Sequence, residues 1–189
     1  CMKKLLIVGG SGTIARAFLN EYYDYYDFHC IARNERHLAE IKRDFPMVDI
    51  YTGNIENKTQ LFYQFDKIKP DIVVHMAAMK HVNLVEENPI QGAIINVQGS
   101  LNVIEACIRT DVPVTVGLST DKACAPENVY GYTKSILESC FLESNSNRNK
   151  FACTRFANVA LTSDSVIPLW KTLIFLSKID TIFSCFLSL

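Results

Sequence analysis

Short apolar runs alternate with helix-like segments along this chain, and the alternation limits the fold more than any other feature of the sequence. Runs such as KLLIV and FHCIA are rich in aliphatic and β-branched residues and have the length of buried strands. The segments between them carry apolar residues at helical spacing. Strand and helix repeated with short links imply right-handed crossovers. The sequence therefore predicts an α/β fold, a Rossmann-like, doubly wound parallel sheet with helices on both faces.

The same periodicity gives the order of the elements. We expect strands at residues 4–9, 28–32, 48–53, 71–77, 112–119 and 150–160. We expect helices at residues 13–23, 34–45, 57–68, 89–110 and 129–144. Ligands bind at the carboxyl ends of the strands in such a sheet, so polar residues that directly follow a strand are the candidates for a site.

Composition and charge exclude several classes of function. A net charge of -1 gives no electrostatic basis for binding nucleic acid or an anionic membrane. The seven cysteines form no C-x-x-C pair, and no histidine pair has zinc spacing, so no metal site is expected. The apolar start meets glycines too soon for a signal peptide, and we expect a cytoplasmic protein. Buried free thiols fit that compartment, and the cysteines in apolar segments are Cys30, Cys107, Cys140 and Cys153.

A glycine-rich segment, GGSGTIA at residues 9–15, directly follows the first expected strand, and we call it the glycine turn. Its spacing matches G-x-x-G-x-x-A. Glycines let a chain turn tightly and let a pyrophosphate approach the backbone, with the amino end of the next helix aimed at it. In a βαβ pattern this predicts a dinucleotide site, and the alternative is a purely structural turn. The candidate contacts are Gly9, Ser11, Gly12, Thr13 and Ile14.

The residues after the second strand indicate which dinucleotide binds. An NAD site usually has Asp or Glu there to hold the ribose 2′-hydroxyl. This chain has Arg33 and Asn34 instead, and the planar guanidinium of Arg33 suits a 2′-phosphate. We therefore expect NADP rather than NAD. The alternative is that Arg33 is a solvated charge at the start of a helix.

The loop after the fourth strand adds further candidate contacts. Ala77 and Ala78 are small enough for a nicotinamide ribose to pack against the backbone. Lys80 and His81 follow at the edge where phosphates would lie, so we expect Lys80 to contact cofactor and substrate and His81 to contact substrate. A surface or helix-capping histidine is the alternative for His81. His75 lies inside an apolar strand, and we expect a hydrogen-bonded core histidine there.

The stretch STDKACAPENVYGYTK, residues 119–134, follows the fifth strand, and we call it the reactive block. Tyr130 and Lys134 are four residues apart and share a helix face, whereas Tyr132 faces away. An ammonium beside a phenol is expected to lower the pKa of Tyr130, so that the tyrosine can take a proton from a sugar hydroxyl. An amphipathic surface pair is the alternative. The other reactive side chains of the block are Thr120, Asp121 and Lys122.

Several of these segments together resemble one enzyme family: GGSGTIA, AAMKHVNLVEENP, NVQGSLNVIEA, STDKACAPENVYGYTK and RFANV. They resemble the extended short-chain dehydrogenase/reductases, and within them the UDP-N-acetylglucosamine 4,6-dehydratases of surface polysaccharide and glycan biosynthesis. Thr-Asp-Lys at residues 120–122 is the most specific match, and Tyr130 resembles the soluble branch that also inverts carbon 5. The resemblance further implies that Asn54 and Ile55 contact the adenine and that Asn158 contacts the substrate.

The resemblance implies a cyclic reaction on a nucleotide sugar with no net redox change. Tyr130 takes the 4-hydroxyl proton while carbon 4 gives hydride to NADP⁺, Lys134 holds the nicotinamide ribose, and Thr120 hydrogen-bonds the same hydroxyl. Lys122, as a neutral amine, removes the proton on carbon 5. Asp121, if protonated, helps the 6-hydroxyl to leave as water. An ordinary ion pair in a loop is the alternative for Asp121 and Lys122.

The carboxyl end departs from the family pattern, because the substrate lobe of the family is largely absent and NVALTSDSV replaces a glycine-rich segment. We expect an NAD(P)-binding Rossmann domain at residues 1–168 and an apolar tail at residues 169–189. Charged residues divide the tail into apolar pieces that are too short to span a bilayer. An apolar surface left by the missing lobe favours a homo-oligomer. The alternatives to a dehydratase are a truncated, inactive NAD(P)-binding domain and a nucleotide-sugar 4-epimerase.

Overall fold

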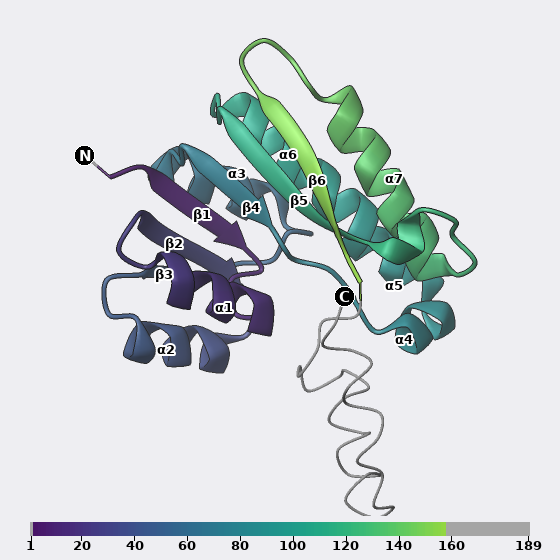
Figure 1. Ribbon diagram of the computed structural model, residues 1–189, viewed down its shortest axis with the longest axis horizontal. Helices are drawn as coiled ribbons and strands as arrows, with labels where there is room; N and C mark the ends of the chain where they lie inside the picture. Colours follow the sequence, from purple (N-terminus) through teal and green to yellow (C-terminus); the bar gives the residue numbers. More distant parts are fainter. Residues whose placement is uncertain (1, 158–189) are drawn as a thin grey trace, which may run out of the picture. The chain divides into compact units, whose positions relative to one another are not determined.

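The chain folds around a parallel six-stranded sheet in the order β3-β2-β1-β4-β5-β6, in a computed structural model that describes residues 2–157 (Figure 1). The order reverses between β1 and β4, the position where doubly wound sheets bind ligands. The predicted fold class is confirmed. The strands are β1 (Lys4–Val8), β2 (Asp27–Ala32), β3 (Asp49–Thr52), β4 (Ile72–His75), β5 (Val114–Thr120) and β6 (Lys150–Phe156).

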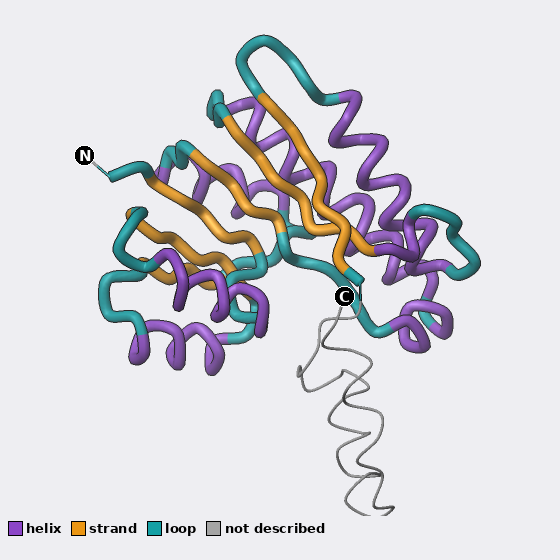
Figure 2. The backbone as a smooth tube through the Cα atoms, viewed as in Figure 1, coloured by secondary structure: helices purple, strands orange, loops and turns teal. Residues whose placement is uncertain are grey.

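Helices cover both faces of the sheet. Two of them, α1 (Thr13–Tyr22) and α2 (Glu35–Asp44), lie on one face beside β1, β2 and β3 (Figure 1). The helices on the other face are α3 (Lys58–Ile68), α6 (Gly99–Arg109) and α7 (Val129–Glu143). Two short helices, α4 (Val82–Glu87) and α5 (Pro89–Ala93), pack against α7 (Figure 2).

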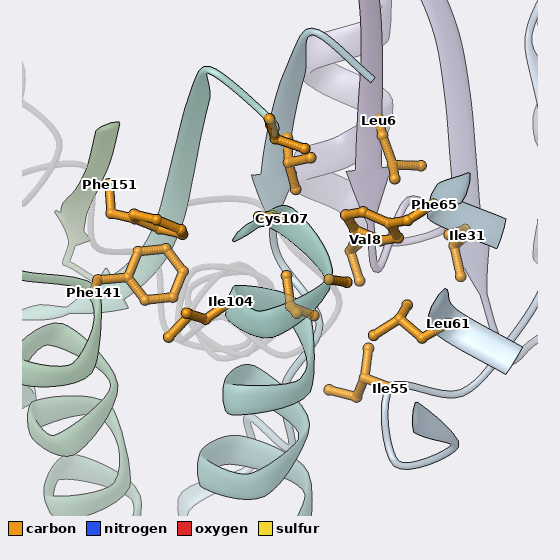
Figure 3. Close-up of a cluster of buried hydrophobic side chains, with 14 of the residues drawn as sticks. Leu6, Val8, Ile31, Ile55, Leu61, Phe65, Ile104, Cys107, Phe141 and Phe151 are labelled. Carbon is orange, nitrogen blue, oxygen red and sulfur yellow. The ribbon is translucent and has the colours of Figure 1, made fainter. Parts of the chain in front are cut away.

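The two faces of the sheet carry separate apolar cores, because successive strand residues point to opposite sides. Leu6 and Val8 of β1 lie near Phe65 of α3, and Phe141 of α7 packs against Phe151 of β6 in the same core (Figure 3). The alternate residues of β1 pack instead with helices α1 and α2, and the buried side chains of that core include Leu5, Ile7, Leu19, Leu38 and Ile41. The central strand β1 is therefore buried on both faces, which explains its uninterrupted apolar sequence.

Two helical details differ from the prediction. The helix expected at 89–110 is continuous but contains a π-helical turn, Ile94–Gln98, between α5 and α6. The π turn brings Asn96 into a fully buried position, and such turns are frequent at functional sites. Helix α4 has only six residues, which is too short for its periodicity to be recognised in the sequence.

Several expectations about single residues can be compared with the described part of the chain. Cys30 and Cys107 are buried free thiols as predicted, whereas Cys140 and Cys153 are only partly buried. Among residues 2–157, no helix is long and apolar enough to cross a membrane, and no cluster of ligating side chains could hold a metal ion. The proposed contact Asn158 and the tail at 169–189 lie outside the described residues.

Candidate active site

The first two residues of the glycine turn, Gly9 and Gly10, lie in contacts that leave no room for a side chain. Gly9 has a φ of +90°, and a Cβ there would lie 2.5 Å from the backbone nitrogen of Ala77. A Cβ at Gly10 would lie 2.7 Å from the Cβ of Cys30. The backbone nitrogens of Gly9 and Gly10 both donate to the Ile31 carbonyl, at 2.8 and 3.1 Å. These contacts hold the turn against β2 and against the loop after β4.

The amino end of α1 is arranged to accept an anion. Gly12 is the N-cap residue and its backbone is extended. Because glycine has no side chain, Gly12 makes no side-chain hydrogen bond to the first N–H groups of the helix. A Cβ at Gly12 would come no closer than 4.0 Å to the Gly9 carbonyl oxygen, so the fold itself does not require glycine at this position. Open space over uncapped N–H groups, at the positive end of a helix dipole, fits the pyrophosphate of a dinucleotide.

The remaining residues of the glycine turn lie around this space. Thr13 is exposed at the first position of α1, while Ser11 and Ile14 are half-buried. Ala15 is fully buried in the core beneath the helix. Their contact with a cofactor stays a prediction, and the residues present fit a dinucleotide.

The two candidates after β2 have different roles in the structure. The side chain of Arg33 is 59% exposed, and its Nη1 lies 3.8 Å from Oε1 of Glu56. Asn34 is the N-cap of α2, where its Oδ1 accepts a hydrogen bond from the backbone nitrogen of His37 at 3.1 Å. The side chain of Asn34 therefore satisfies the backbone of its own helix through Oδ1, and its contact with a cofactor stays a prediction.

The candidates after β3 are also held by the protein itself. Asn54 Nδ2 donates to Glu56 Oε1 at 3.1 Å, and the backbone nitrogen of Glu56 donates back to Asn54 Oδ1 at 3.2 Å. The side chain of Ile55 is buried in the core, and its carbonyl accepts from Asn102 Nδ2 at 2.8 Å. The core thus occupies the Ile55 side chain, and a contact of this residue with the adenine stays a prediction.

The loop after β4 continues from the glycine turn. The backbone nitrogens of Met76 and Ala77 donate to the Val8 carbonyl at 2.7 and 2.9 Å, which keeps the loop beside β1. Ala77 and Ala78 are half-buried. Lys80 is exposed, and His81 is exposed at the N-cap position of α4 without a side-chain cap. The structure places these candidates at the carboxyl edge of the sheet, and their ligand contacts stay a prediction.

A chain of hydrogen bonds joins this loop to the reactive block. The amide of buried Asn96, in the π turn, accepts from the Met79 nitrogen at 2.7 Å and donates to the Met79 carbonyl at 3.0 Å. Asn96 Nδ2 also donates to Thr133 Oγ1 at 3.1 Å, and Thr133 Oγ1 donates to the Tyr130 carbonyl at 2.8 Å. Together with the contact between Gly9 and Ala77, these bonds connect the glycine turn to the helix turn that carries Tyr130.

Tyr130 lies in the first turn of α7 and is half-buried. Burial raises the pKa of its phenol, the charge of Asp121 raises it further, and a hydrogen bond with Thr120 opposes the rise. The predicted lowering of the Tyr130 pKa is therefore wrong for the protein without ligands. Thr120 itself is buried and its hydroxyl donates to Asp121 Oδ1 at 2.8 Å.

Lys134 explains why the predicted effect on Tyr130 is missing. Its side chain is only 4% exposed, and Nζ donates to the Leu118 carbonyl at the end of β5, at 2.8 Å. Burial lowers the pKa of Lys134 to about 8. The spacing of four residues puts both side chains on one face of α7, but the ammonium is bound by a strand carbonyl. Tyr132 is 54% exposed and faces away, as predicted.

Asp121 and Lys122 form a short 3-10 turn directly after β5. Asp121 Oδ1 accepts from the Lys122 backbone nitrogen at 2.9 Å and from its Nζ at 3.3 Å. A hydrogen bond from Thr120 and then the contacts with Lys122 lower the pKa of the Asp121 carboxyl, whose side chain is 53% exposed. The expected protonation of Asp121 is therefore absent in this state, because the burial that it requires does not occur.

Other polar residues in this region were not identified from the sequence. Glu86 of α4 accepts from the Val129 nitrogen at 2.9 Å and so fixes the start of α7. Glu138 of α7 accepts two bonds from Arg155 of β6, at 2.9 and 2.8 Å. Asn96 and Thr133 carry the link described above, and an asparagine within the apolar pattern of a helix was the available signal for it.

Comparison with known proteins places these features in a family. The model of a family described as polysaccharide biosynthesis protein matches residues 5–182. An inverting UDP-N-acetylglucosamine 4,6-dehydratase of Campylobacter jejuni is 34% identical over 181 residues, 91% of this chain and 54% of that protein. A UDP-glucose 4-epimerase of Rickettsia canadensis is 31% identical over 180 residues, 89% of this chain and 52% of that protein. The chain thus spans about half the length of the curated relatives that it matches.

Solved structures have the same fold. The crystal structure of Pen from Bacillus thuringiensis is 32% identical, with a TM-score of 0.84 over 93% of this chain and 57% of that chain. WbmG of Bordetella bronchiseptica, solved in complex with NAD, is 22% identical and shares the fold alone, with a TM-score of 0.77 over 92% of this chain and 60% of that chain. The sequence, the fold and the family model agree, and the chain belongs to the polysaccharide biosynthesis protein family.

Proposed function

We propose that this chain carries the cofactor site and the catalytic residues of an NADP-dependent nucleotide-sugar 4,6-dehydratase. The substrate would be UDP-N-acetylglucosamine and the product a 4-keto-6-deoxy sugar inverted at carbon 5, for surface polysaccharide or glycan biosynthesis. The observation that carries the proposal is the run of Thr120, Asp121 and Lys122 at the carboxyl end of β5, where the Thr120 hydroxyl donates to Asp121 Oδ1 at 2.8 Å and Lys122 Nζ lies 3.3 Å from the same oxygen. The identity of 34% to an inverting dehydratase supports the same reaction.

In this proposal each side chain has a defined task. Thr120 and Tyr130 bind the 4-hydroxyl, and Tyr130 takes its proton. Lys122, as a neutral amine, removes the proton on carbon 5, and Asp121 helps the 6-hydroxyl to leave. Bound NADP would accept hydride at carbon 4 and return it at carbon 6, and its pyrophosphate would lie over Gly12 at the start of α1.

Three of these tasks require a change from the described state. Lys122 lies 3.3 Å from Asp121 as an ion pair and must lose a proton before it can act as a base. Tyr130 is held as a phenol by burial, so its base role requires added positive charge, which Lys134 supplies when its ammonium leaves the Leu118 carbonyl. Asp121 is anionic near neutral pH, so its acid role requires the bound sugar to remove it from water. Binding of cofactor and substrate supplies these three changes in the proposal.

Product analysis tests the proposal. The purified chain is incubated with UDP-N-acetylglucosamine and NADP⁺, and the product is identified by NMR, with Lys122→Ala as the inactive variant. Lys150→Ala, which removes a lysine from the start of β6, is the matched control and should retain activity. A 4-keto-6-deoxy product that depends on Lys122 is the expected result.

A 4-epimerase is the second candidate, because a Rickettsia canadensis 4-epimerase is 31% identical to this chain. It predicts UDP-N-acetylgalactosamine as the product in the same experiment. Binding of NADP without any product would favour a nucleotide-binding domain that does not turn over, and would contradict both enzymatic proposals.

A further inference from the structure

One carboxylate at the carboxyl edge of the sheet joins helix α5 to two segments that the sequence assigned to cofactor binding. Glu56 follows β3 and its side chain is 26% exposed. Its Oε1 accepts from Asn54 Nδ2 at 3.1 Å and lies 3.8 Å from Arg33 Nη1. Its Oε2 accepts from Gln91 Nε2 at 3.3 Å. The end of β2, the loop after β3 and helix α5 therefore meet at this one side chain.

The position of Glu56 is fixed rather than adjustable. Its backbone nitrogen donates to Asn54 Oδ1 while its carboxylate accepts from the amide of the same residue, so backbone and side chain are both held. The next side chain towards the core, Ile55, is buried. The carboxylate thus presents a stationary negative charge to Arg33.

This charge matters for the ribose end of a dinucleotide. A 2′-phosphate at the end of β2 would need the guanidinium of Arg33, and it would have to compete with Glu56 for it. A ribose 2′-hydroxyl carries no charge and can donate to a carboxylate, so the same residue does not oppose NAD.

We propose that Glu56 determines the cofactor specificity of the chain. Glu56 engages the guanidinium of Arg33 and so lowers the affinity for NADP relative to NAD. The inference rests on the proposed function, because it assumes that a nicotinamide dinucleotide binds at the glycine turn. Removing the charge while keeping the shape frees Arg33 for the phosphate. Glu56→Gln therefore shifts the preference towards NADP.

Titration calorimetry with NADP⁺ and NAD⁺ separately tests this inference on the purified chain. We expect Glu56→Gln to strengthen NADP⁺ binding about fivefold, the effect of a partly exposed charge pair, and to leave NAD⁺ binding within about twofold. Arg33→Ala should weaken NADP⁺ binding, and the gain from Glu56→Gln should vanish in the double variant. Asp66→Asn is the matched control, because it removes a carboxylate paired with Arg109 from the far end of α3.

A second variant guards against effects of folding. Glu56→Asp keeps the charge, and its ratio of NADP⁺ to NAD⁺ affinity should stay within about twofold of the unmodified chain. An unchanged ratio in Glu56→Gln, or a gain that survives Arg33→Ala, would overturn the inference while leaving the proposed function intact. Binding of neither dinucleotide to the unmodified chain would overturn both.

Discussion

The glycine turn and the reactive block lie at the same edge of the sheet but are built in different ways. The glycine turn is made of backbone, and its shape is set by close approaches such as that of Gly9 to Ala77. The reactive block is made of side chains, and its behaviour depends on which of them are buried and charged. Lys134 is almost fully buried, whereas Asp121 is exposed. One half of the candidate site is therefore steric, and the other half is electrostatic.

This difference separates what each region contributes to a reaction. A backbone cradle binds an anion whatever the pH, because its N–H groups do not titrate. A buried lysine and a half-buried tyrosine have protonation states that depend on burial and on the surrounding charges. We therefore expect substitutions in the glycine turn to change stability and binding, and substitutions around the reactive block to change the dependence on pH.

The largest expected effect is in the glycine turn. Gly9→Ala places a Cβ 2.5 Å from a backbone nitrogen at a φ of +90°, where L residues are strained. The free energy of unfolding should fall by roughly 3 to 5 kcal/mol in urea denaturation.

Gly12, in the same turn, is the control for this prediction. Gly12→Ala meets open space at an extended backbone conformation, so it should cost at most about 1 kcal/mol. Equal losses at Gly9 and Gly12 would show that the turn is not held by the loop after β4.

The second effect concerns Lys134 and sharpens the electrostatic half of the comparison. Its folded pKa of about 8 lies below the unfolded value of 10.5, so the unfolded chain holds more protons between these values and stability rises with pH there. The stability of the unmodified chain relative to Lys134→Met should rise by about 2 to 3 kcal/mol between pH 7 and pH 10.

The exposed Lys150 provides the matched control. The stability difference between the unmodified chain and Lys150→Met should stay constant between pH 7 and pH 10. Chemical denaturation at each pH gives the measurement. A flat difference for Lys134→Met as well would mean that the Lys134 ammonium is as well solvated in the folded protein as in water.

The smallest effect concerns His75, on the strand between the two regions. Its Nε2 lies 2.9 Å from Ser100 Oγ, and its Nδ1 has no hydrogen-bond partner among the described residues. Burial, with the charge of Lys134, lowers its pKa from 6.5 to about 3. The unfolded chain therefore holds more protons between these values, and stability is lost as the pH falls below 6.5.

The expected loss at pH 5 relative to pH 7.5 is about 2 kcal/mol, and His75→Gln should remove it. His37→Gln, at an exposed position of α2, should leave it unchanged. Denaturation midpoints at both pH values test this, and an equal loss in His75→Gln would assign the acid sensitivity to other groups.

The fold was predictable because each strand and most helices have a period or an apolar run of their own. The buried His75 followed from its place in such a run, and it is confirmed as a core residue with a hydrogen-bonded Nε2. Helix α4 was missed because six residues give no period, and the π turn because it depends on the bonds of Asn96 with the Met79 loop.

The candidate site was predictable as a set of positions and less so as a set of charges. Spacing put Tyr130 and Lys134 on one helix face, but it could not show that Lys134 donates to the Leu118 carbonyl. Asn34 was assigned to the cofactor because it stands beside Arg33 after β2, and only the structure shows that its side chain caps α2. For the contact of Asn96 with Thr133 the only signal was an asparagine within an apolar helical pattern, and that signal does not identify its partner.

The central claim is that the glycine turn and the reactive block form one cofactor site. Hydrogen–deuterium exchange of the chain, measured by mass spectrometry with and without NADP⁺, tests it most directly. We predict that peptides covering residues 9–15 and peptides covering residues 129–134 both exchange more slowly when NADP⁺ is present. Protection of only one of these segments, or of neither, would contradict the account.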